Sequence, residues 1–159
     1  MGFLKGRIED YSSPLAALPV RLYTGYFFLK YGLAKFTGGF GGAGLHETLS
    51  KWAEGPAYHF YVPFLQEVAI PHASLFAHFV TLGEIVVGSL LLLGCACRLA
   101  ALGGLFLCLN FLFASGAPIL STEQPAVFTL LLVTIYATAA GRALGIDALL
   151  KHRLPRWVA

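Results

Sequence analysis

Four long stretches of the sequence are almost free of charged residues. They occupy about residues 15–36, 73–93, 98–116 and 126–143. An α-helix rises about 1.5 Å per residue, so ~20 apolar residues cross a hydrocarbon layer of ~30 Å. The apolar residues follow one another without the strict alternation of a membrane-spanning strand. The pattern predicts an all-α, polytopic membrane protein, in which one domain over 1–159 forms an antiparallel four-helix transmembrane bundle.

The connection 37–72 is much longer than the other two predicted loops. Within it, Leu45, Leu49 and Trp52 recur at helical spacing, and charged residues occupy the opposite face. A helix with one apolar and one polar face commonly lies in the interface between membrane and water. We therefore expect an amphipathic interfacial helix in the first external loop.

The composition supports a membrane location, since 57% of the residues are hydrophobic and 12% are charged. The mean hydropathy is +0.73. Cytoplasmic loops of membrane proteins are enriched in Lys and Arg. The basic residues on the side of the termini are Lys5, Arg7, Arg98, Arg142, Lys151, Arg153 and Arg156. We expect an inner (cytoplasmic) membrane protein with both termini in the cytoplasm, and the net charge of +3 then needs no nucleic-acid partner.

Glu84 lies near the middle of the second apolar stretch, where an ionised side chain is costly and needs a partner. Counting residues from the span ends places Arg21 at a similar depth, and we predict an Arg21–Glu84 pair. Such a pair either fixes the register of the helices or lines a ligand pocket. Asn110, on the third stretch, either bonds to a neighbouring helix or contacts a ligand. The sequence has no zinc-type His/Cys spacing and no haem, flavin or Walker signature, so no metal or nucleotide cofactor is expected.

Several short motifs, in order along about residues 18–150, resemble the DoxX family. They are Arg21-Leu-Tyr-Thr-Gly25, Gly32-Leu-Ala-Lys35-Phe36, Gly83-Glu84 with Gly88, Leu91-Leu-Leu-Gly94 and Arg98-Leu-Ala-Ala. Two further motifs, Asn110-Phe111 with Ala114-Ser115-Gly116 and Gly141-Arg142 with Leu144-Gly-Ile-Asp147, are similar to its DoxD branch. That branch is described as the membrane subunit of thiosulfate:quinone oxidoreductase.

The resemblance implies a subunit of a quinone-linked oxidoreductase that works with partner protein subunits. Glu84 would then relay protons, with Arg21 setting its charge state, so these two are the candidate catalytic residues. Asn110 or Tyr31 would contact a quinone carbonyl. Lys35 and His46 would attract a small anionic substrate from outside.

Two other functions remain open at this stage. The first alternative is a non-catalytic anchor or accessory subunit of a larger respiratory or photosynthetic complex. Transport of a small solute is less favoured, because the four apolar stretches show no inverted repeat.

The charge distribution predicts the outcome of reporter fusions. Alkaline phosphatase fused to the C-terminus should be inactive, because it would stay in the cytoplasm, whereas a fusion within 37–72 should be active. A strongly active C-terminal fusion would rule out this orientation.

Overall fold

The computed structural model describes residues 15–150. Over that range the chain is all helical and contains no strand. The four principal helices are α2 (Leu18–Thr37), α5 (Ala73–Leu93), α6 (Cys97–Ser115) and α7 (Gln124–Thr138). The predicted all-α class is therefore confirmed.

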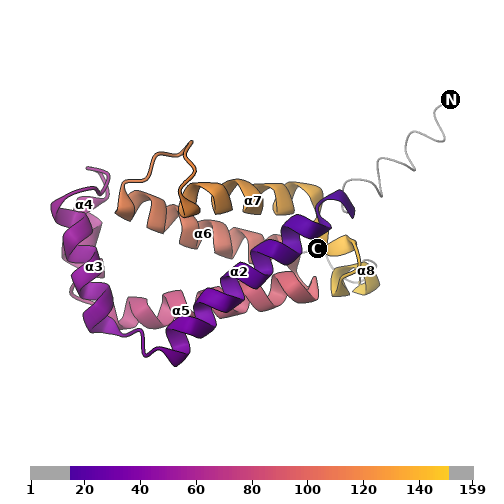
Figure 1. The fold of residues 1–159 in the computed structure, drawn as a ribbon, viewed down its shortest axis with the longest axis horizontal. Coiled ribbons are helices and arrows are strands. Elements are labelled where there is room, and N and C mark those ends of the chain that lie inside the picture. Colours follow the sequence, from indigo (N-terminus) through magenta and orange to yellow (C-terminus); the bar gives the residue numbers. More distant parts are fainter. Residues whose placement is uncertain (1–14, 151–159) are drawn as a thin grey trace.

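The principal helices alternate in direction and pack around a common core (Figure 1). Helix α2 lies along α5, α6 lies along α7, and contacts from α5 to α6 and from α2 to α7 complete the bundle. One end is covered by α3 (Gly42–Glu54), α4 (Val62–Phe64) and the π-helix η1 (Leu65–Ala69). The other end holds the 3-10 turn η2 (Ala140–Arg142) and α8 (Ile146–Leu150). We call these the α3 end and the α8 end.

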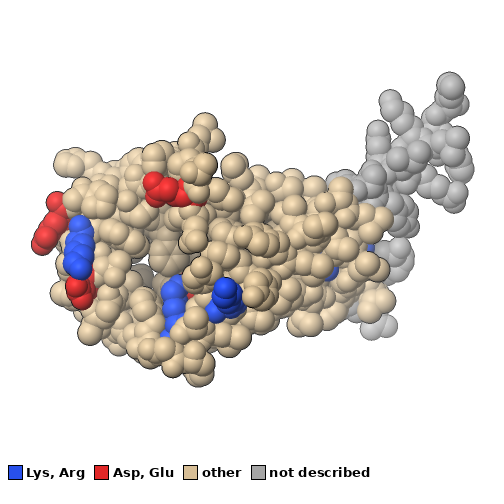
Figure 2. Space-filling model, viewed as in Figure 1, with Lys and Arg blue, Asp and Glu red and all other residues tan. Residues whose placement is uncertain are grey.

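Two of the described helices, α5 and α6, are long and apolar enough to cross a membrane. Helix α2 has 20 residues but carries Arg21, Lys30 and Lys35. Helix α7 is apolar but has 15 residues, and it ends at Thr138, before the predicted limit of 143. It ends there because Ala139 adopts a left-handed conformation with φ 50° and the chain turns into η2. Much of the surface in Figure 2 is uncharged, as expected for contact with lipid.

Glycines bring α2 and α5 unusually close together. A Cβ atom added to Gly32 would lie 2.8 Å from the backbone nitrogen of Ile85, and one added to Gly25 would lie 3.0 Å from that of Leu92. On α5, a Cβ atom on Gly88 would lie 2.8 Å from the carbonyl oxygen of Gly25. Small residues allow such close backbone packing in membrane helices. These contacts fix the register of the two helices.

Helix α3 is amphipathic, as predicted, with Leu45 and Leu49 buried. The register places the end of α2 level with the middle of α5, so the first part of α5 extends beyond α2. Leu45 and Leu49 pack there, in a cluster with Ala73, Ala77 and Leu65. The apolar face of α3 is thus buried largely against the protein itself, and the interfacial location of this helix stays a prediction.

Two buried charged side chains hold the α8 end together. The carboxylate of Asp147 accepts hydrogen bonds from the backbone nitrogens of Ala96, at 2.7 Å, and Cys97, at 2.9 Å. These contacts satisfy backbone donors at the start of α6. Arg21 Nη1 donates to the carbonyl oxygens of Ala140 and Ala143, each at 2.8 Å. The segment after α7 is therefore tied to both α2 and α6.

Candidate functional site

Glu84 forms an ion pair with Lys35 inside the bundle. Glu84 lies in the middle of α5 and is 6% exposed, whereas Lys35 lies in the last turn of α2. Lys35 Nζ donates to Glu84 Oε1. The same ammonium group lies 5.7 Å from the centroid of the Phe40 ring and 5.5 Å from that of Phe111. Aromatic faces at this distance stabilise a cation further.

The predicted Arg21–Glu84 pair is wrong, because Arg21 bonds to backbone carbonyls at the α8 end. The contact of Gly32 with α5 explains the difference, since a Cβ atom there would lie 3.0 Å from Glu84 Cβ. Arg21 precedes Gly32 by 11 residues, or roughly 16 Å along the helix axis. Lys35 follows Gly32 by less than one turn and therefore reaches Glu84.

The ion pair forms part of the wall of a cavity of about 520 Å³, which we call the ion-pair cavity. Tyr31 and Cys108 contribute from α2 and α6, and Ser115 lines the cavity at the end of α6. The segment 122–125, just before and at the start of α7, completes the wall toward the α3 end. Beside these polar groups the cavity is largely aromatic, with Phe27, Phe28, Trp52, Phe111 and Phe128.

The aromatic wall is built from α2 and α7. The ring centroids of Phe27 and Phe128 lie 3.9 Å apart, and those of Phe27 and Tyr31 lie 4.4 Å apart. Phe28 meets Phe128 edge to face, with centroids 5.9 Å apart. Stacked and edge-to-face rings of this kind form a stiff apolar surface. The wall is therefore suited to a flat, uncharged ring.

Two buried polar atoms of this cavity's lining residues lack a partner among the described residues. They are Glu84 Oε2 and Ser115 Oγ. A buried polar atom without a hydrogen bond costs about 1–3 kcal/mol. Such a cost is commonly offset by a ligand or by ordered water. The carboxylate oxygen is an acceptor, and the hydroxyl can donate, so a ligand here would offer both kinds of polar group.

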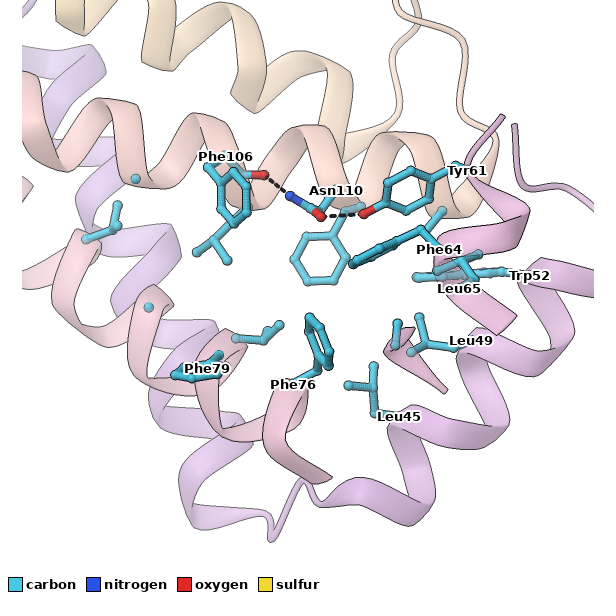
Figure 3. A pocket seen from close by; sticks show the side chains of 18 of the residues that line it. Leu45, Leu49, Trp52, Tyr61, Phe64, Leu65, Phe76, Phe79, Phe106 and Asn110 are labelled. Atoms are coloured by element: carbon cyan, nitrogen blue, oxygen red, sulfur yellow. Dashed lines mark hydrogen bonds between the residues drawn. The ribbon is translucent and has the colours of Figure 1, made fainter. Parts of the chain in front are cut away.

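A second cavity, of about 560 Å³, lies between α5 and α6 and is closed by α3 and η1 (Figure 3). We call it the apolar cavity. Asn110 lies in this cavity, where its Oδ1 accepts a hydrogen bond from the Tyr61 hydroxyl and its Nδ2 donates to the Phe106 carbonyl at 2.7 Å. Burial raises the pKa of Tyr61 to about 12. Asn110 thus links α6 to the loop before α4.

The structure therefore gathers three of the predicted site residues, Glu84, Lys35 and Tyr31, in the ion-pair cavity. Asn110 belongs to the apolar cavity, and Arg21 belongs to the α8 end. His46 is exposed on α3 and lines neither of these two cavities.

Sequence reasoning missed Ser115 and the aromatic wall as parts of the site. Phe27 and Phe28 lie about one helical turn before Tyr31, and this spacing was a usable signal for an aromatic face on the first apolar stretch. Phe128 faces them from α7, which no spacing within one helix reveals.

The described residues form an all-helical bundle with a buried ion pair and with two helices that are long and apolar enough to cross a membrane. The sequence profile of the DoxX family matches residues 16–117, more than half of the chain, and the protein belongs to this family. No curated protein and no solved structure matches the chain. The matched region includes Lys35, Glu84 and Ser115. It ends before Gly141–Asp147, one of the motifs on which the resemblance to the DoxD branch rests.

The ion pair predicts a specific pattern of coupled stability. Lys35→Met and Glu84→Gln should each destabilise the protein, because each leaves a charged or polar partner unpaired. The double variant should cost less than the sum of the two single changes by about 1 kcal/mol or more. Thermal unfolding in detergent measures these free energies. The control is the double variant Arg21→Met with Glu84→Gln, in which the destabilisation should equal the sum of those of the two single variants. Additive costs for Lys35 and Glu84 would contradict the pairing.

Proposed function

We propose that this DoxX family protein is the quinone-binding membrane subunit of an oxidoreductase, with the quinone head group bound in the ion-pair cavity. The observation that carries the proposal is the pair of unpartnered buried atoms, Glu84 Oε2 and Ser115 Oγ, on residues lining an aromatic cavity. A quinone head group is a flat ring with two opposed oxygens. It needs donors when oxidised and an acceptor when reduced.

The residues present fit such a head group. Phe27, Phe28 and Phe128 supply the apolar wall for the ring. The Ser115 hydroxyl is a donor for one oxygen, and Tyr31 is a second hydroxyl in the same wall. Glu84 supplies the acceptor for a reduced, hydroxyl-bearing ring. Binding would therefore satisfy both polar atoms that the folded chain leaves unpaired.

A bound quinone supplies two-electron redox chemistry, and the residues of the chain manage the protons that accompany it. Glu84 Oε2 is the atom at which a proton is held and passed to the ring oxygen. Lys35 keeps the other carboxylate oxygen hydrogen-bonded and so holds the carboxyl group in place. The polar residues Thr122, Glu123 and Gln124 in the cavity wall give protons a route between the α3 end and the carboxylate. In the expected topology that end faces the outside.

The electrons come from a partner subunit in this proposal. Thiosulfate as their source is a narrower proposal, which rests on the resemblance to the DoxD branch and on exposed His46. Lys35 is a weaker candidate for collecting the anion, because its charge is offset by Glu84. Anion capture in this proposal therefore depends mainly on the partner.

The proposal predicts saturable binding of a quinone without a tail, such as 2,3-dimethoxy-5-methyl-1,4-benzoquinone. The sequence has two tryptophans, so a Trp157→Phe background leaves Trp52, which lines the cavity, as the fluorescent reporter. In this background the quinone should quench the purified full-length protein. Ser115→Ala should weaken binding about three- to tenfold, which corresponds to one hydrogen bond. The control is Thr134→Ala, because the Thr134 hydroxyl bonds to Leu130 in its own helix.

The same proposal predicts a loss of turnover when the proton-carrying group is removed. In native membranes, Glu84→Gln should lower quinone reduction at least ~100-fold per assembled complex, the usual contribution of an acid–base group. Quenching that does not saturate, together with turnover that falls only in step with lost assembly, would reject the quinone site. That result would favour the alternative role as an accessory or anchoring subunit.

A further inference from the structure

We propose that the apolar cavity holds the long hydrocarbon tail of the quinone whose head group binds in the ion-pair cavity, so that the protein selects long-tailed membrane quinones. This inference rests on the proposed function and adds the substrate class and its route of entry. The two cavities share Trp52 and Phe111 as lining residues. The Phe111 ring also lies beside Lys35, so the head-group site and the apolar cavity meet at this ring.

The chemistry of the apolar cavity suits a hydrocarbon chain. Aliphatic and aromatic side chains from α3, η1, α5 and α6 point into it, including Leu45, Leu49 and Phe76 (Figure 3). Its principal polar side chains, Tyr61 and Asn110, bond to each other. The wall therefore offers little to a polar ligand and is suited to the CH₂ groups of a hydrocarbon tail.

The position of the apolar cavity suits entry from the bilayer. Phe79 and Phe106 line it and are 61% and 68% exposed, so the cavity is open at these two residues. They belong to α5 and α6, the two described helices that are long and apolar enough to span a membrane. The cavity thus reaches the surface along a seam between lipid-facing helices.

Two glycines leave this seam free of side chains. Gly83 and Gly103 line the cavity from α5 and α6. A Cβ atom on Gly103 would lie 3.5 Å from Val87 Cγ2, an ordinary contact distance, so a side chain there needs no shift of the backbone. A large side chain at Gly103 would instead occupy the seam that the tail requires.

The occupant is a quinone tail rather than the acyl chain of a phospholipid, because the apolar cavity shares two lining residues, Trp52 and Phe111, with the ion-pair cavity. A phospholipid would have to leave its charged head group outside, and the space around Lys35 and Glu84 would stay empty. A tailed quinone fills both cavities with one molecule.

The test compares two quinones that share a head group, one without a tail and one with a decyl tail. Fluorescence quenching of Trp52 in the Trp157→Phe full-length protein measures both affinities in the same detergent. The decyl compound should bind at least about tenfold more tightly to the reference protein, and Gly103→Phe should remove this advantage while preserving binding of the tailless compound. Leu102→Phe is the matched control, because Leu102 neighbours Gly103, is 45% exposed and does not line the cavity. Leu102→Phe should therefore keep the tighter binding of the decyl compound. Partitioning of the quinones into micelles is the same for all variants and cancels in the comparison.

The outcomes separate this inference from the proposed function. The tail site would be overturned if the decyl compound bound more tightly than the tailless one by the same factor in the reference protein, Gly103→Phe and Leu102→Phe. The head-group site would be unaffected by that result. Failure of both quinones to bind the reference protein would overturn both. Removal of the advantage by excess phospholipid alone would identify an acyl chain as the occupant and also overturn the tail site. Gly103→Leu provides the same comparison if Gly103→Phe does not fold.

Discussion

A carboxylate in the middle of an apolar helix constrains this bundle more than any other feature. Glu84 is buried on α5, and ionisation at such a depth requires a cation within reach. Lys35 meets that requirement only because α2 and α5 pack with their backbones almost in contact. Gly25, Gly32 and Gly88 set this approach, so the ion pair and the helix register depend on one another.

The remaining contacts hold α2 at this depth. Arg21 anchors its start to the segment after α7, and Asp147 in the same region anchors the start of α6. At the α3 end, α3 covers the part of α5 that α2 does not reach. The aromatic wall between α2 and α7 then leaves a cavity beside the ion pair instead of a filled core. A buried ion pair next to open space is poorly explained as a purely structural staple, since well-packed apolar residues often stabilise as much.

The sequence predicted the helical class, the amphipathic α3 and the need of Glu84 for a charged partner, because each follows from apolar runs or from the cost of a buried charge. The partner of Glu84 was not predictable by counting from span ends. That count assumes that the ends of neighbouring helices lie at the same depth. In the structure α5 extends beyond α2, and the glycine contacts set the register. Asn110 was singled out as a polar residue of the third apolar stretch, but its bond to Tyr61 comes from a loop whose path the sequence does not define. Family membership was predictable from short motifs across the matched region.

Infrared difference spectroscopy of the purified protein tests most directly whether the ion pair faces a quinone. The spectrum is recorded with and without the tailless quinone, and bands missing in Glu84→Gln are assigned to the Glu84 carboxyl group. The account predicts that saturating quinone shifts the band of the Glu84 carboxyl group. A Glu84 band that stays unchanged while the quinone is bound would contradict a head group beside Glu84.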